Sequence, residues 1–182
     1  EFDPPRAINP YGASKLAGEQ YCRAFTGVYG LETVCLRYFN VFGPRQDPTS
    51  QYSGVIPLFI TAMLQGESPT VHGDGLQSRD FSYVSNVVHA NLLAATAAGA
   101  VGQVFNIACG KRYTLLDMIA ALSDILGTQI EPVHTEPRVG DVRHSLADIS
   151  AAQEVLGYRV LVDFADGLRQ TVDWYREQIA EE

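Results

Sequence analysis

The first long segment of the chain repeats apolar residues at helical spacing. The repeated positions are Leu16, Ala17, Tyr21, Ala24 and Phe25. Asn9 is a favourable N-cap and Pro10 a favourable first helical residue, so the pattern predicts a helix over 10–29 that ends near Gly30. The next segment, 32–39, is short, β-branched and aromatic, which predicts a buried strand. A helix followed by a buried strand is half of a parallel α/β unit.

Helical and strand patterns alternate along the rest of the chain. Further helices are expected at 55–66, about 86–98, 115–126, about 148–156 and 164–180, and short strands at 69–75, 79–83, 103–108 and 130–134. Ser85 or Asn86 is expected to cap the helix that ends near residue 98. The residues of that helix expected to pack inward are Val88, Leu92, Leu93 and Ala95. Only 32–39 and 103–108 are candidates for a parallel sheet with both faces covered.

Composition narrows the class of protein. The chain has 182 residues, of which 46% are hydrophobic and 19% charged, enough to bury a core in one domain or one and a half. The net charge of −8 argues against a nucleic-acid partner. No apolar run reaches about 18 residues and no signal-peptide pattern is present, so no membrane partner is expected.

The spacing of cysteine and histidine predicts no metal site. Cys22, Cys35 and Cys109 are far apart and form no C-x-x-C, and the four histidines show no ligand spacing. Scattered cysteines in odd number are typical of reduced thiols in a cytoplasmic protein. We therefore expect a cytoplasmic location.

Candidate chemistry lies at the start of the first predicted helix. Tyr11 and Lys15 stand four residues apart and share one helix face. A lysine ammonium and the positive end of a helix both favour the phenolate form of a tyrosine, whose pKa is ordinarily near 10. The pair could therefore make Tyr11 a general base at neutral pH. A tyrosine half-buried beside a solvated lysine is the alternative interpretation of the same spacing.

Further motifs accompany this pair: RYFNVFGPR (37–45), GDG (73–75), RDF (79–81) and RVGDVRHS (138–145). With these motifs in this order, the chain resembles the NAD-dependent epimerase/dehydratase family, the extended short-chain dehydrogenases, over essentially its whole length. Within the family it is most similar to the UDP-N-acetylglucosamine 4-epimerases. That similarity comes from RQDP (45–48), VIP (55–57) and GDVRHSLADIS (140–150).

The resemblance implies an α/β fold class, with the C-terminal part of a Rossmann-like parallel sheet and a smaller α/β substrate-binding domain. The Rossmann domain would comprise 1–53 and 84–110, and the substrate-binding domain 54–83 and 111–182. Family members carry a further segment in front that holds a glycine-rich dinucleotide loop. No G-x-G-x-x-G occurs in this chain. We therefore expect the C-terminal part of a larger protein, inactive when isolated.

The resemblance also implies an activity and a cofactor. UDP-sugars would be interconverted at C4, with UDP-GlcNAc and UDP-GalNAc as the expected pair, by NAD-dependent hydride transfer through a 4-keto sugar. Tyr11 would take the proton of the sugar 4-hydroxyl. Lys15 would lower the pKa of that tyrosine, and both residues would contact the nicotinamide ribose of NAD.

A substrate site follows from the resemblance as well. Arg79 and Arg138 would bind the diphosphate, since a guanidinium matches phosphate oxygens, and Asp141 the ribose hydroxyls. Asn40, where the strand at 32–39 ends, would contact the diphosphate or the sugar. The other implied positions are Gly54, Val55 and His72, through backbone contacts, and Ser145, whose small side chain leaves room for an N-acetyl group.

Other interpretations stay open for these residues and for the chain. Asn40 could satisfy the backbone of a turn, Arg79 could pair with Asp74 or Asp80, and 136–144 could be a solvated charged loop. A 4,6-dehydratase or decarboxylase of nucleotide sugars would share the Tyr-Lys pair. A non-catalytic UDP-sugar-binding protein and a purely structural piece are the alternatives of another class. The complete protein is expected to be a homodimer, and this chain to self-associate.

Overall fold

The computed structural model describes residues 7, 9–50, 54–138, 140 and 142–181. Its helices are α1 (Pro10–Tyr29), α2 (Val55–Leu64), α3 (Val84–Ala94), α4 (Leu115–Leu126), α5 (Ser150–Leu156) and α6 (Phe164–Glu181). Its strands are β1 (Cys35–Tyr38), β2 (Val41–Phe42), β3 (Thr70–His72), β4 (Ser78–Arg79), β5 (Ser82–Tyr83), β6 (Val104–Ile107), β7 (Tyr113–Thr114) and β8 (Val133–Thr135). The expected α/β class is confirmed. None of the described helices is long and apolar enough to cross a membrane.

The helix that carries the Tyr-Lys pair begins and ends as predicted. The Asn9 side chain accepts a hydrogen bond from the Gly12 N–H at 2.8 Å, and Pro10 is the first helical residue. Gly30 ends α1 with φ of +68°, a left-handed conformation that glycine adopts without strain. The carbonyl of Thr26 accepts from the Gly30 N–H.

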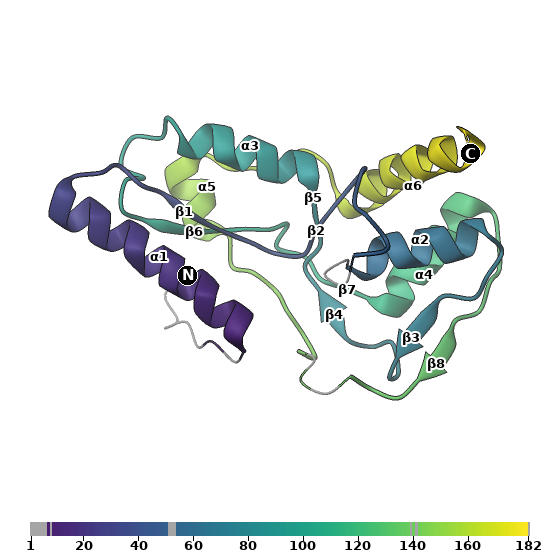
Figure 1. Ribbon diagram of the computed structural model, residues 1–182. Helices are drawn as coiled ribbons and strands as arrows, with labels where there is room; N and C mark the ends of the chain where they lie inside the picture. Colours follow the sequence, from purple (N-terminus) through teal and green to yellow (C-terminus); the bar gives the residue numbers. More distant parts are fainter. Residues whose placement is uncertain (1–6, 8, 51–53, 139, 141, 182) are drawn as a thin grey trace.

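The two segments expected to form a parallel sheet do so. β1 and β6 pair in parallel, with Leu36 opposite Phe105, and α1 lies on one side of the pair while α3 and α5 lie on the other (Figure 1). Two further pairs are parallel, β2 with β5 and β3 with β8, and β4 pairs with β7 in antiparallel orientation. The expected strand at 79–83 is therefore two short strands in different sheets, because the chain changes partner at Asp80.

The hydrophobic core consists of two clusters of buried residues. One joins α2, α4 and α6 around residues such as Ile60, Met118 and Leu168. The other packs α3 and α5 against β6, around Phe105. Figure 1 shows these two groups of helices at opposite ends of the molecule, connected through β2 and β5. The expected domain boundaries remain a prediction, and α5 lies with β6 although 111–182 was assigned to the other domain.

The prediction for α3 was wrong in its start, in its end near residue 98 and in most of its buried face, although Leu93 packs against the core as expected. The helix begins at Val84, directly after β5, and no side chain caps it. Val88 and Leu92, expected inside, are 53% and 68% exposed, whereas Val87 and Ala90 are buried. The strand that precedes the helix fixes its rotation, so the residues that face β6 differ from those the apolar pattern suggested.

Asn86, expected as a cap, instead binds a distant loop. Its Oδ1 accepts from the N–H groups of Leu161 and Val162, and its Nδ2 donates to the Val162 carbonyl at 2.7 Å. The side chain is fully buried. The buried amide therefore has its hydrogen-bonding groups satisfied by the backbone of the loop at 161–162.

Substitution of Gly167 by alanine is expected to destabilise the fold by about 1–3 kcal/mol, the usual cost of overpacking. Gly167 lies in α6, and a Cβ there would come within 2.8 Å of the Tyr83 ring. Tyr83 is itself held by a hydrogen bond from its hydroxyl to Gln170 at 3.1 Å, so the ring cannot move away cheaply. Urea unfolding measures the change, with Gly27→Ala, where the same probe meets nothing within 4 Å, as the control.

Candidate active site

A cavity of about 870 Å³ is lined mainly by α2, by the segments around β2, β3 and β4, and by Tyr11 of α1. Its size falls in the range of small-molecule sites, roughly 300–1,000 Å³. It gathers seven of the expected site residues from separate parts of the chain. They are Tyr11, Asn40, Gly54, Val55, His72, Arg79 and Arg138. A single cavity therefore connects the proposed base with the proposed phosphate-binding arginines.

Tyr11 and Lys15 lie together on the exposed face of α1. The Lys15 Nζ is 5.3 Å from the centroid of the Tyr11 ring, a cation–π distance, and Tyr11 is 65% exposed. Lys15 is exposed too, and it does not line the cavity as the structure describes it. The tyrosine therefore projects into the cavity, while the lysine stands behind its ring.

Asn40 combines the two roles considered for it. It follows β1, has φ of +24°, and its own carbonyl accepts from the Ser82 N–H at 3.2 Å. Its Nδ2 donates to the Asp80 carbonyl at 3.3 Å, so it does support the backbone of a turn. The same side chain lines the cavity. An amide nitrogen has two hydrogens, and the second could reach a ligand.

Arg79 lies on β4 and lines the cavity, and its guanidinium contacts backbone carbonyls. Its Nη1 donates to the Ser78 carbonyl at 2.9 Å and to the Arg143 carbonyl at 3.4 Å. Of the two aspartates considered as its ion-pair partners, Asp74 pairs with Arg143, and the Asp80 carboxylate accepts from backbone N–H groups. These carbonyl contacts fix the orientation of the Arg79 guanidinium at the cavity.

The carboxylate of Asp80 is a buried hydrogen-bond acceptor that connects distant parts of the chain, and the sequence did not predict this role. It accepts from the N–H groups of Cys109 at 2.9 Å, Gly110 at 3.0 Å and Ala147 at 3.4 Å, and the residue is fully buried. Burial raises the pKa of this carboxyl, and the N–H donors oppose that rise. The one feature of the sequence that could have indicated this role is an ionisable residue between Arg79 and Phe81, in a segment that is otherwise buried.

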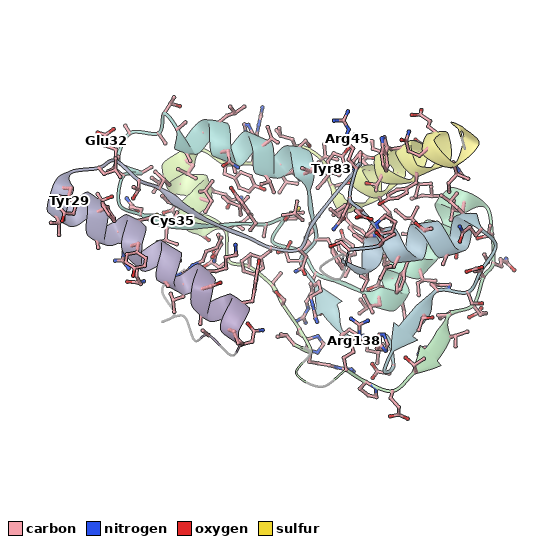
Figure 2. All side chains as sticks on the ribbon, viewed as in Figure 1. Tyr29, Glu32, Cys35, Arg45, Tyr83 and Arg138 are labelled. Atoms are coloured by element: carbon pink, nitrogen blue, oxygen red, sulfur yellow. The ribbon has the colours of Figure 1, made fainter. Side chains whose placement is uncertain are left out.

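The remaining expected residues surround the other end of the cavity. Gly54 caps α2, so the first N–H groups of that helix face the cavity beside Val55. His72 ends β3, where its Nδ1 and the Thr135 Oγ1 are 2.8 Å apart. Arg138 is exposed and lies near β3 and β4 (Figure 2). Asp141 lies outside the described residues.

Ser145 takes a different place from the lining residues. Its N–H donates to the Ser78 carbonyl at 2.9 Å, and it is not among the described residues that line the cavity. Several lining residues were not predicted as site residues. They include Tyr38, Gln46, Ser68, Thr70, Gln77 and Phe81. Gln46 and Phe81 belong to the motifs RQDP and RDF. The sequence therefore singled out these motifs, but it did not predict that these two residues line the cavity.

Comparisons with known proteins show the family to which the chain belongs. A family model described as the NAD dependent epimerase/dehydratase family matches residues 1–108. This chain belongs to that family. Its members use NAD, so the nicotinamide cofactor expected from the sequence fits the assignment. No group of three histidine, cysteine or acidic residues that could hold a metal occurs in the described part.

Individual relatives are similar over nearly the whole chain. A putative UDP-glucose 4-epimerase of Methanocaldococcus jannaschii is 38% identical, with 97% of this chain and 56% of the relative covered. A dTDP-glucose 4,6-dehydratase of an Actinoplanes strain is also 38% identical, covering 97% and 54%. The structure of UDP-N-acetylglucosamine 4-epimerase from Methanobrevibacter ruminantium, in complex with UDP-N-acetylmuramic acid, has a TM-score of 0.93 and 44% identity over 98% of this chain and 57% of that one. This chain thus spans about half the length of the relatives it matches.

The residues present fit one end of NAD. Tyr11 and Lys15 stand side by side on an exposed helix face, and together they offer a hydroxyl and an ammonium to the vicinal hydroxyls of a ribose. Bound there, a nicotinamide would supply the acceptor for a hydride.

Proposed function

We propose that the protein is a UDP-sugar 4-epimerase that interconverts UDP-N-acetylglucosamine and UDP-N-acetylgalactosamine. The supporting observation is the single cavity in which Tyr11 lies together with Arg79 and Arg138. A nucleotide sugar has its diphosphate between the nucleoside and the reacting sugar. Two arginines and a base in one cavity match that order of chemical groups.

In this proposal each side chain acts on a different part of the substrate. Arg79 and Arg138 bind the diphosphate, and Asn40 donates its second amide hydrogen to the diphosphate or the sugar. Tyr11 accepts the proton of the 4-hydroxyl as C4 is oxidised, and returns it when the 4-keto sugar is reduced on its other face. The Lys15 ammonium stabilises the negative charge that develops on the tyrosine oxygen.

The choice of sugar rests on Ser145 and on the M. ruminantium enzyme. The family resemblance implies that a small residue at position 145 leaves room for an N-acetyl group, but Ser145 does not line the cavity as described. The sequence of the M. ruminantium enzyme is 44% identical to this chain. The runner-up reaction is 4,6-dehydration, supported by the 38% identity to a dTDP-glucose 4,6-dehydratase. A protein that binds UDP-sugars without turnover is the candidate of another class.

The first experiment incubates the chain with NAD and each of UDP-N-acetylglucosamine, UDP-glucose and dTDP-glucose, and separates the products by chromatography. Conversion of UDP-N-acetylglucosamine to its 4-epimer is expected in the fused form described below, whereas this chain by itself is expected to be inactive. Formation of a 4-keto-6-deoxy sugar would instead establish the dehydratase. Because the relatives are longer, the same assay is run on this chain fused behind the N-terminal part of the M. ruminantium enzyme. Calorimetric UDP binding without turnover in either form would favour the non-catalytic alternative.

Self-association of this chain through α1 is a further expected result. No described residue of α1 is buried, and Tyr21 and Val28 are 67% and 72% exposed. Apolar surface on this scale favours contact with a second copy. Sedimentation velocity should show a mass that grows with concentration, and the double variant Tyr21→Lys/Val28→Lys should shift it toward the monomer. A wild-type mass that stays monomeric at all concentrations would contradict the proposal.

A further inference from the structure

The segment that carries Arg138 is attached to the rest of the protein at both ends. On one side β8 pairs with β3, with His72 opposite Thr135. On the other side residues 143–145 run beside β4. There the Ser78 N–H donates to the Arg143 carbonyl at 2.9 Å, and the Ser145 N–H donates to the Ser78 carbonyl at 2.9 Å. The geometry of this second attachment therefore sets where Arg138 and Arg79 stand relative to each other.

A pair of charged side chains reinforces the second attachment. Arg143 Nη1 and Nη2 donate to Asp74 Oδ1 and Oδ2, each at 2.7 Å, which is a two-pronged guanidinium–carboxylate contact across 69 residues of sequence. The His144 Nδ1 also lies 2.8 Å from the Ser78 Oγ. Consecutive side chains thus tie this segment to the turn before β4 and to β4 itself.

Asp74 is held in a fixed orientation by the glycine turn. Its Oδ1 also accepts from the Leu76 N–H at 3.0 Å, as in an Asx turn. Gly75 has φ of +77°, and a Cβ there would come within 2.8 Å of the Leu116 side chain, so the turn packs tightly on α4. A carboxylate presented from a rigid turn can fix the position of its arginine partner, whereas one on a mobile loop could not.

We propose that the Asp74–Arg143 pair is a positioning device for diphosphate recognition. It holds residues 143–145 against β4, and so favours the arrangement in which Arg138 and Arg79 line the same cavity. Arg143 itself does not line the cavity as described, and its carbonyl accepts from Arg79 at 3.4 Å. This inference rests on the proposed UDP-sugar site and adds two residues to it that act through others.

Asp74 and Arg143 both stay charged at the near-neutral pH of a binding experiment. The guanidinium of Arg143 holds the pKa of Asp74 at about 2. Because that value is below the ordinary 3.8, the pair is fully charged above about pH 4 and its contribution declines only as the pH falls toward 2.

The test compares Asp74→Asn, Arg143→Ala and the double variant in this chain. Asparagine keeps an acceptor for the Leu76 N–H, but removes the charge and one of the two oxygens that accept from Arg143. Hydrogen exchange of the Ser78 and Ser145 amides reports the attachment directly, and calorimetry reports UDP affinity. Each single variant should speed exchange at Ser145 and weaken UDP binding by about threefold to tenfold. The double variant should be no worse than either single variant, because each residue acts only through the other.

The controls separate this inference from the proposed function. Arg169→Ala removes another exposed Asp–Arg pair, 3.5 Å apart on α6, and should leave exchange and binding unchanged. Urea midpoints that stay near the wild type would exclude a general loss of stability. Wild-type exchange and affinity in both single variants, or effects that multiply in the double variant, would overturn the inference. If the wild-type chain bound no UDP, the proposed function would fail, and amide exchange would still decide whether the pair holds the segment.

Discussion

Replacement of Tyr11 by phenylalanine is expected to slow sugar turnover by about 100- to 10,000-fold, the usual contribution of a general acid–base group. The substitution removes only the hydroxyl that would take the proton of the sugar. Tyr11 is 65% exposed on α1, so its loss should leave the fold intact. The measurement is the rate of epimer formation from UDP-N-acetylglucosamine, in the fused form described above if this chain is inactive by itself.

Two results would identify the role of Tyr11 more closely. The affinity for UDP should change by less than about twofold, because the hydroxyl contributes to the reaction and not to diphosphate binding. Tyr21→Phe is the matched control, since Tyr21 lies on the same helix, is 67% exposed and does not line the cavity as described. A Tyr11→Phe protein that turns over within threefold of the wild type would contradict the proposed mechanism.

Replacement of Asp80 by alanine is expected to destabilise the protein by about 3–5 kcal/mol, because it leaves several buried backbone N–H groups without an acceptor. The carboxylate accepts from Cys109, Gly110 and Ala147, which belong to a different part of the chain from β4 and β5. Losing it would loosen the link between the two clusters of buried residues. Urea unfolding followed by circular dichroism measures the change.

Replacement of Asp80 should also weaken ligand binding in the cavity. The Asp80 carbonyl accepts from Asn40, and Arg79 precedes it, so displacement of this backbone would disturb both ligand-facing side chains. Asp166→Ala, at an exposed position on α6, is the control and should cost less than about 0.5 kcal/mol. A stability for Asp80→Ala within 1 kcal/mol of the wild type would show that water replaces the carboxylate at little cost.

The ionisation of Asp80 also predicts how the stability of the wild type depends on pH. Burial raises the pKa of Asp80 above 3.8, so the folded state binds a proton more tightly there than the unfolded state. The part of the Asp80 contribution that is linked to its ionisation is therefore fully present below pH 3.8 and is lost as the pH rises through the raised pKa. Asp80→Asn should lack this component, which the difference between its unfolding curves and those of the wild type would show.

Local sequence was sufficient for the elements that depend on local chemistry. Asn9, Pro10 and Gly30 predicted both ends of α1, because capping and left-handed glycine act within a few residues. The β-branched runs near 35 and 104 predicted the parallel pair. The expectation that 32–39 is a buried strand was wrong, because the residues of β1 are only partly buried and Tyr38 is 48% exposed. The motifs supplied most of the cavity lining, including Tyr11 and Arg79.

Only the tertiary structure decided the contacts between distant segments. Asp74 pairs with Arg143, 69 residues away, and Asp80 accepts a hydrogen bond from Ala147, 67 residues away. No periodic pattern in the sequence predicts such pairs. The buried face of α3 was likewise set by the strand before it, which fixes the rotation of the helix. Short-range propensities act through neighbouring atoms along the chain, whereas partner choice depends on which surfaces the complete fold brings together.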